Sequence, residues 1–323
     1  MATHDKWMKR SLELASLGLE NVHPNPMVGA VLVYNDQIIG EGWHQQYGKA
    51  HAEINAFNSV KYPELISKST LYVNLEPCSH FGKTPPCADA IIQYRVPKVV
   101  MGPLDINSKV NGKGVKKLQE AGIEVIDNIL HKECLELNKR FFTFHTKKRP
   151  YIILKWARTR NNYMDIERNG KEDIQKYWIT NPELKVITHK WRSEEAGILV
   201  GFNTMKNDQP QLTTRLYPGK DPQRFVMQRG EEIIASALPY IPVSENLSEA
   251  MATLYQQNIL SIMVEGGKKT LEKFIAADLW DEVRILTGNQ YWNQGVPAPV
   301  LGILPDREEL IDDNLIQYVR RHL

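Results

Sequence analysis

The sequence has few cysteines, no long apolar run and almost no net charge. Its 323 residues include only three cysteines, an odd number that does not suggest a disulfide framework. No apolar run reaches the roughly 18 residues that a membrane-spanning helix needs. The formal net charge of +2 gives no general case for binding nucleic acid or a membrane surface. These absences favour a cytoplasmic protein without a nucleic-acid or membrane partner.

The chain is long enough for two domains. Its composition, 42% hydrophobic and 24% charged, is ordinary for a globular protein, and 323 residues exceed what one compact core usually holds. Charges interrupt every apolar stretch of the first 20 residues, which favours an amphipathic helix over a signal peptide. The basic stretch "HTKKRP" ends at Pro150, where a helix is expected to stop. We therefore predict two domains, 1–146 and 147–323.

Helical and strand patterns alternate in both halves, which predicts an α/β fold with helices packed on sheets. In the first half we expect a hairpin in "VGAVLVYNDQIIGEGWH", strands in "STLYVNLEP", "KVVMG" and "GIEVI", and helices over 6–20, 51–60, 87–95, 113–121 and 131–144. In the second half we expect strands in "PYIILKWA", "GILVG", "DPQRFVM", "ILSIMVEGG" and "DEVRILTG", and helices in "NPELKVITHKWRSEEA", "LSEAMATLYQQN" and "KTLEKFIAADLW". Asn181 and Pro182 are typical of a helix start.

Four residues form the pattern of a catalytic metal site. His51 and Cys87 each begin a predicted helix, whose N-terminal partial positive charge favours a thiolate, and Cys78 follows a predicted strand. One imidazole and two thiolates leave the fourth tetrahedral position of a zinc ion to water. Glu53 can then move that water's proton without binding the metal.

The order H-x-E, then P-C, then a second cysteine is typical of zinc-dependent nucleobase deaminases. Taken singly, a histidine at a helix start is usually a packing or capping residue, and cytosolic cysteines are mostly buried small hydrophobes. The combination outweighs these interpretations, although eight residues separate Cys78 from Cys87 where two are usual. Cys134 lies in a Lys/Glu-rich helix, and we interpret it as structural.

With that enlarged gap, the sequence closely resembles the bifunctional riboflavin-biosynthesis deaminase/reductase family. The similar deaminase motifs are "HPNPMVGAVLV", "GEGWHQQYGKAHAE", "LEPCSHFGKTPPC" and "GPLDINSKVNGKG". The similar reductase motifs are "RPYIILKWA", "WITNPE", "HKWRSEEAGILVGFNTMKNDQPQLTTR" and "VEGG". The resemblance covers nearly the whole chain.

The resemblance implies a fold and a pair of reactions. It implies a cytidine-deaminase-like three-layer αβα domain followed by a dihydrofolate-reductase-like α/β domain. The first domain would be a zinc-dependent hydrolase that releases ammonia from a phosphoribosylated diaminopyrimidine. The second would be an oxidoreductase that uses NADPH to reduce the product's ribosyl group to a ribityl chain. It also implies a homo-oligomer formed through the reductase domain.

Residue by residue, the resemblance implies that His51, Cys78 and Cys87 bind zinc and that Glu53 is the catalytic proton carrier. The positions that match deaminase substrate contacts are Asn25, His44, His80, Lys83, Thr84, Asp105 and Asn107. Those that match NADPH contacts are Ala157, Trp178, Thr204, Asp208 and Gly267, and those that match reductase substrate contacts are Arg192, Leu212, Arg215 and Glu265. Arginine forks suit phosphates, and "VEGG" between a strand and a helix suits a pyrophosphate.

The chain departs from the family's pattern in several places. Lys83 stands where the family usually has Arg, and Gln228 where an Asp is usual. Asn161 and Asn162 replace Asp and Gly in a turn, where Asn can adopt a left-handed backbone. The segment between "RFVMQRGEEIIAS" and "LSEAMATLY" is shorter than usual, and we expect it to lack a strand.

Two alternatives to the bifunctional enzyme are open at this stage. One is a deaminase that acts on another base, such as a tRNA adenosine or a free nucleotide, although the near-neutral charge and the long second domain argue against RNA. The other is a deaminase whose second half is a degenerate, non-catalytic dimerisation domain, which the "TRNN" turn and the shortened segment would explain.

Overall fold

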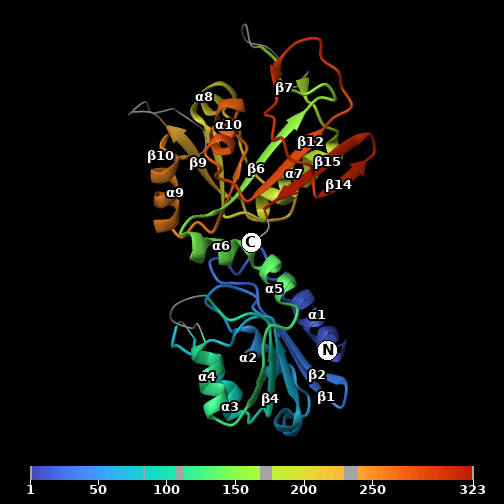
Figure 1. Ribbon diagram of the computed structural model, residues 1–323, viewed down its shortest axis with the longest axis vertical. Coiled ribbons are helices and arrows are strands. Elements are labelled where there is room, and N and C mark those ends of the chain that lie inside the picture. The colour runs from blue at the N-terminus through green and yellow to red at the C-terminus, as the bar shows by residue number, and fades with distance from the viewer. Residues whose placement is uncertain (1, 83, 107–111, 168–176, 229–238, 322–323) are drawn as a thin grey trace. The chain divides into compact units, whose positions relative to one another are not determined.

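The computed structural model describes all residues except 1, 83, 107–111, 168–176, 229–238 and 322–323 (Figure 1). Two compact units divide the chain, Met1–Lys147 and Lys148–Leu323. No helix in the described part of the chain is long and apolar enough to cross a membrane.

The first unit is built on a five-stranded sheet in the order β2-β1-β3-β4-β5. The hairpin β1 (Gly29–Tyr34) and β2 (Gln37–Trp43) is antiparallel, as is the pairing of β1 with β3 (Thr70–Val73). The strands β4 (Lys98–Met101) and β5 (Glu124–Ile126) continue the sheet parallel to β3. The predicted hairpin and strands of this half are therefore confirmed.

Helices cover both faces of this sheet. Apolar side chains of α2 (Ala52–Ser59), α3 (Cys87–Gln93) and α4 (Lys113–Glu120) form one core with one face of the sheet. Those of α1 (Ala2–Ser16) and α5 (His131–Leu137) form a second core on the other face. This arrangement is the predicted three-layer αβα fold.

One predicted helix of this unit is in fact two. The expected helix over 131–144 is divided at Asn138 into α5 and α6 (Lys139–Lys147). The Asn138 amide is buried and binds the backbone of Met27, donating to its carbonyl at 2.9 Å and accepting from its N–H at 2.8 Å. Cys134 is buried in the core, as a structural cysteine should be.

The second unit contains an eight-stranded sheet in the order β10-β9-β8-β11-β6-β12-β15-β14. Its strands are β6 (Tyr151–Arg158), β8 (Gly197–Gly201), β9 (Gln223–Gln228), β10 (Ile241–Ser244), β11 (Ser261–Val264), β12 (Glu282–Thr287), β14 (Arg307–Ile311) and β15 (Asn314–Arg320). The pairings from β10 to β12 are parallel, and β15 pairs antiparallel with both β12 and β14. Two short strands, β7 (Tyr163–Asp165) and β13 (Val296–Pro297), pair separately.

Helices α9 (Leu247–Gln256) and α10 (Lys268–Ala276) pack on one face of this sheet, and α7 (Pro182–Ser193) and α8 (Phe202–Asp208) on the other. The Asn181 side chain caps α7 by accepting a hydrogen bond from the Leu184 N–H at 3.0 Å, as predicted. Asn162 has a φ of +71°, so the "TRNN" turn adopts the left-handed backbone that we expected of it.

The expectation that the shortened segment lacks a strand is wrong. Strand β10 lies there and pairs with β9. Pro242 has no N–H to donate, and such a residue is tolerated in an edge strand, where one side needs no partner. The β14–β15 hairpin was also absent from the sequence prediction.

Candidate active sites

The structure brings together the three predicted metal ligands of the first unit. His51 immediately precedes α2, Cys87 is the first residue of α3, and Cys78 lies in the segment that follows β3. The His51 Nδ1 atom lies 3.2 Å from Cys87 Sγ and 3.5 Å from Cys78 Sγ. One ligand atom from each residue falls within 4.8 Å of the others, a spacing that suits one tetrahedral ion.

The protonation of these ligands also suits a metal. The hydrogen bond from Cys87 is the main cause that lowers the pKa of Cys78 to about 4, and His51 adds to it. The same hydrogen bond, together with burial, raises the pKa of Cys87. The environment therefore favours a thiolate at Cys78, and a zinc ion would displace the second thiol proton. The residues fit zinc.

Glu53 lies in the first turn of α2 and is buried, with 3% of its surface exposed. Burial is the main cause that raises the pKa of its carboxyl group, and the negative charge of Cys78 raises it further. A carboxyl group in this environment can exchange a proton near neutral pH more readily than an exposed one. Its position matches the predicted proton carrier.

Two predicted substrate contacts, His44 and Thr84, lie against the His51 ring, and a third, Asn25, contacts His44. The Asn25 Nδ2 atom lies 3.1 Å from His44 Nε2, and His44 Nδ1 lies 3.1 Å from the Ala50 carbonyl. Thr84 Oγ1 lies 3.3 Å from His51 Nε2. His80 Nδ1 is buried without a hydrogen-bond partner in the described part of the chain.

Of the other predicted deaminase contacts, only Asp105 lies in the described part of the chain. Asp105 is buried, and its N–H donates to Glu76 at 3.0 Å. Lys83 and Asn107 lie outside the described residues. Sequence reasoning missed Asn74, whose side chain accepts a hydrogen bond from the Gly29 N–H at 2.8 Å and donates to the Met27 carbonyl at 3.0 Å. An asparagine directly after an apolar strand, in "YVNLEP", was the available signal.

A largely buried ion cluster lies in the second unit. The Nε and Nη2 atoms of Arg192 donate to the two oxygens of Glu265, each at 2.8 Å, and Lys155 Nζ lies 3.5 Å from the same carboxylate. Burial alone would raise the pKa of Glu265, but Arg192 and Lys155 outweigh it and bring the value to about 2. Sequence reasoning named Arg192 and Glu265 and missed Lys155.

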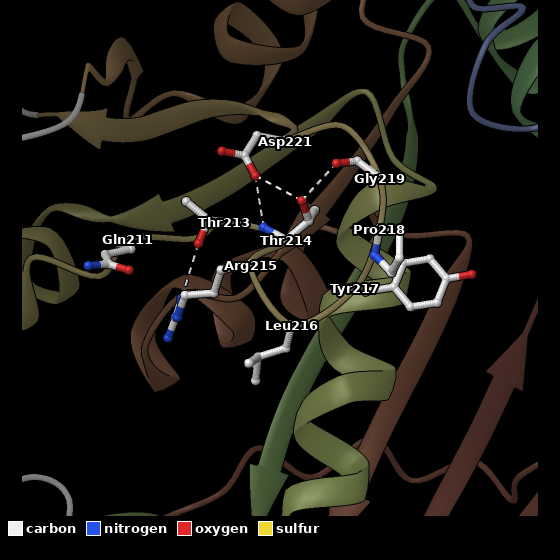
Figure 2. A pocket seen from close by; sticks show the side chains of 9 residues that line it. All are labelled: Gln211, Thr213, Thr214, Arg215, Leu216, Tyr217, Pro218, Gly219 and Asp221. Atoms are coloured by element: carbon white, nitrogen blue, oxygen red, sulfur yellow. Dashed lines mark hydrogen bonds between the residues drawn. The ribbon is translucent and has the colours of Figure 1, made fainter.

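A surface cavity of about 720 Å³ lies beside this cluster, in the loop 211–221 (Figure 2). Arg215 lines the cavity, and Arg192 Nη1 donates to the Thr213 carbonyl at 3.1 Å. Asp221 holds the loop by accepting from both the N–H and the hydroxyl of Thr214, at 2.8 and 3.0 Å. The Leu212 side chain is buried in the core, so only its backbone can reach a ligand.

Two strand-to-helix turns of this unit lie side by side (Figure 1). Thr204 of α8 accepts a hydrogen bond from the Gly267 N–H at 3.0 Å, at the start of α10. Gly267 provides no side-chain cap, so the first N–H groups of α10 can bind an anion such as a nucleotide phosphate. The residues therefore fit a dinucleotide phosphate. Of the other predicted cofactor contacts, Asp208 ends α8 and Ala157 lies near the end of β6, while Trp178 contacts Gln290 and Lys185.

Comparisons with known proteins match both halves of the chain. The family model for the cytidine and deoxycytidylate deaminase zinc-binding region matches residues 1–103, and that for the RibD C-terminal domain matches residues 150–288. Riboflavin biosynthesis protein RibD of Aquifex aeolicus is 36% identical, over 94% of this chain and 92% of its own. The chain belongs to the RibD family.

Further relatives extend this likeness over nearly full length. RibD of Escherichia coli strain K12 is 33% identical, over 95% of this chain and 92% of its own. The crystal structure of a diaminohydroxyphosphoribosylaminopyrimidine deaminase/5-amino-6-(5-phosphoribosylamino)uracil reductase from Thermotoga maritima is 33% identical, covers 99% of both chains and has a TM-score of 0.85. A RibD structure from Acinetobacter baumannii, 27% identical over 99% of both chains, has a TM-score of 0.86. The predicted deaminase-plus-reductase fold of a RibD protein is therefore confirmed.

Proposed function

We propose that this RibD protein is the bifunctional enzyme of riboflavin biosynthesis, as the function of its Thermotoga maritima relative suggests. Residues 1–146 would deaminate a phosphoribosylated diaminopyrimidine, and residues 147–323 would reduce the ribosyl group of the product with NADPH. The observation that carries the proposal is the His51, Cys78 and Cys87 cluster with Glu53 in the adjacent helical turn. The match to deaminase/reductases over nearly the whole chain favours this function over a deaminase with a degenerate second half and over a deaminase for another base.

In the deaminase, the chain's residues bind the base and move the proton. Zinc, held by the three ligands, supplies an activated water nucleophile at neutral pH. Glu53 takes a proton from the attacking water and delivers it to the leaving amine, so that ammonia departs. If His44 Nδ1 donates to the Ala50 carbonyl, then Nε2 accepts from Asn25 Nδ2. The Asn25 oxygen then remains to accept a hydrogen bond from a ring N–H of the pyrimidine.

In the reductase, charge orients two phosphorylated ligands. The uncapped start of α10 and Thr204 would bind a phosphate of NADPH, and Arg215 would bind the substrate phosphate. Glu265 holds Arg192 and Lys155 at the site. Converting a ribosyl to a ribityl group adds a hydride and a proton, and Lys155 is a buried ammonium that can supply the proton.

Metal removal tests the deaminase. We expect the purified protein to contain one zinc ion per chain and to release ammonia from the diaminopyrimidine nucleotide. Cys87→Ala removes one of three protein ligands, so both the zinc content and ammonia release should be lost, while NADPH oxidation with the deaminated product should continue. Cys134→Ala is the matched control, since that cysteine lies in the core away from the ligands. Full ammonia release by metal-free Cys87→Ala protein would refute the zinc site.

NADPH titration separates the bifunctional enzyme from the degenerate alternative. Micromolar binding, followed by the fluorescence of the nucleotide, together with oxidation that requires the deaminated product, supports the reductase. No binding up to millimolar NADPH would leave the second unit a non-catalytic domain.

We also propose that the chain is cytoplasmic and forms a homo-oligomer through the reductase unit. None of the three cysteines forms a disulfide, which suits a reducing compartment. In the reductase unit, Val300, Leu304 and Leu310 are 78%, 86% and 73% exposed. They lie on the edge strand β14 and in the loop before it, and such an apolar group commonly marks a protein interface.

Light scattering tests the interface. Wild-type protein should have a mass of at least two chains, and Leu304→Asp should lower it to one chain because a charge would be buried in the contact. Leu17→Asp, at an exposed leucine of the first unit, should leave the mass unchanged. An unchanged mass in Leu304→Asp would place the contact elsewhere.

A further inference from the structure

One buried carboxylate of the deaminase unit gathers four backbone N–H groups. Glu76 follows β3, two residues before the ligand Cys78, and only 4% of its surface is exposed. Its Oε2 atom accepts from the N–H groups of Asp105 at 3.0 Å and Gly112 at 2.9 Å. Its Oε1 atom accepts from those of Gly114 at 2.9 Å and Val115 at 3.3 Å. The Glu76 side chain therefore connects the segment that contains Cys78 to Asp105 and to the start of α4, which are remote in sequence.

These contacts supply what helix α4 lacks at its start. Its N-cap residue, Gly112, has no side chain to accept hydrogen bonds from the first helical N–H groups. Glu76 accepts them instead, and its negative charge interacts favourably with the positive end of the helix. A glutamine of the same shape has only one acceptor oxygen, and its NH₂ group would face N–H donors. The arrangement therefore requires a carboxylate.

Close backbone packing holds the two segments at a fixed distance. A Cβ atom on Gly114 would lie 2.2 Å from the Pro77 carbonyl and 3.0 Å from Glu76 Oε1. Only glycine allows α4 to approach this closely. The Glu76 N–H also donates to the Pro103 carbonyl at 3.2 Å, so the contact extends to the residues just before Asp105. The start of α4 thus lies directly against the residue that precedes Cys78 (α3 and α4 are labelled in Figure 1).

We propose that Glu76 is a positioning residue of the deaminase, which fixes Asp105 and the start of α4 against the Cys78 segment. Its role is to hold one wall of the pyrimidine pocket in register with the metal ligands and Glu53, without contacting the reacting atoms. This inference rests on the proposed deaminase function, because it assigns Asp105 to the wall of that site.

Glu76→Gln tests the role, with Glu120→Gln as the matched control on an exposed part of α4. We expect KM for the diaminopyrimidine nucleotide to rise about tenfold or more, because several N–H groups lose a charged acceptor. The kcat should fall less than about threefold, since Glu53 and the ligands stay in place, and the zinc content should remain that of wild type. Hydrogen exchange of the Gly112, Gly114 and Val115 amides should become faster.

The outcomes separate this inference from the function on which it rests. A variant that keeps KM, or that loses zinc and kcat together, would overturn the positioning role. Wild-type protein that holds zinc but releases no ammonia would refute the proposed function. If the Gly112, Gly114 and Val115 amides of Glu76→Gln exchange as slowly as in wild type, the hydrogen bonds to Glu76 do not hold the start of α4. If Glu76→Gln fails to fold, Gly114→Ala takes its place. It keeps the carboxylate but moves α4 away from Pro77, so the same KM-selective loss is expected, and an unchanged KM would count against the inference.

Discussion

Glu53→Gln is expected to reduce ammonia release by about 10²- to 10⁴-fold, the usual contribution of a positioned general acid–base group. The amide keeps the shape of the side chain but cannot take a proton from the attacking water. Glu53 is buried beside the ligands, so bulk water cannot readily replace it. The measurement is ammonia release under single-turnover conditions, together with the zinc content of the variant.

Two controls make this result specific. Glu64→Gln alters an exposed glutamate of the same unit and should retain full activity. Reduction of the deaminated product by the Glu53→Gln protein should also match wild type, because the reductase residues belong to the other unit. Ammonia release within tenfold of wild type, with zinc retained, would exclude Glu53 as the proton carrier.

The second large effect is expected at Glu265. Replacing it with glutamine leaves Arg192 and Lys155 buried without their shared negative partner, and breaking a buried ion pair in this way typically costs about 3–5 kcal/mol of unfolding free energy. NADPH-dependent reduction should be lost as well. Urea unfolding followed by tryptophan fluorescence measures the stability change. Glu272→Gln breaks only a half-exposed pair with Lys268 on α10 and should cost less than about 1 kcal/mol.

The lowered pKa of Glu265 also predicts how the free energy of unfolding depends on pH. The pKa of Glu265 falls from an ordinary 4.5 to about 2 in the folded protein, so its contribution is complete above about pH 4.5 and is lost as the pH falls toward 2. The difference corresponds to a contribution on the order of 3 kcal/mol. Wild type should therefore lose stability more steeply than Glu265→Gln across this acid range. Parallel curves for the two proteins would contradict the shift.

Local patterns predicted the metal centre because its residues come from short motifs at element ends. His51 immediately precedes one helix and Cys87 begins another, and the chemistry of their side chains is visible without the fold. Lys155 was missed because its partner Glu265 is distant in the chain, although a lysine within the buried strand "YIILKWA" was a signal. The break at Asn138 and the edge strand β10 depend on tertiary contacts that periodicity does not record.

The segment that leaves β3 makes three separate attachments at every second residue. Asn74 binds the backbone of Met27 and Gly29, Glu76 binds the start of α4, and Cys78 belongs to the metal cluster. Adding or deleting one residue here would move Glu76 or Cys78 away from its partners. Natural length variation should therefore be absent between positions 74 and 78.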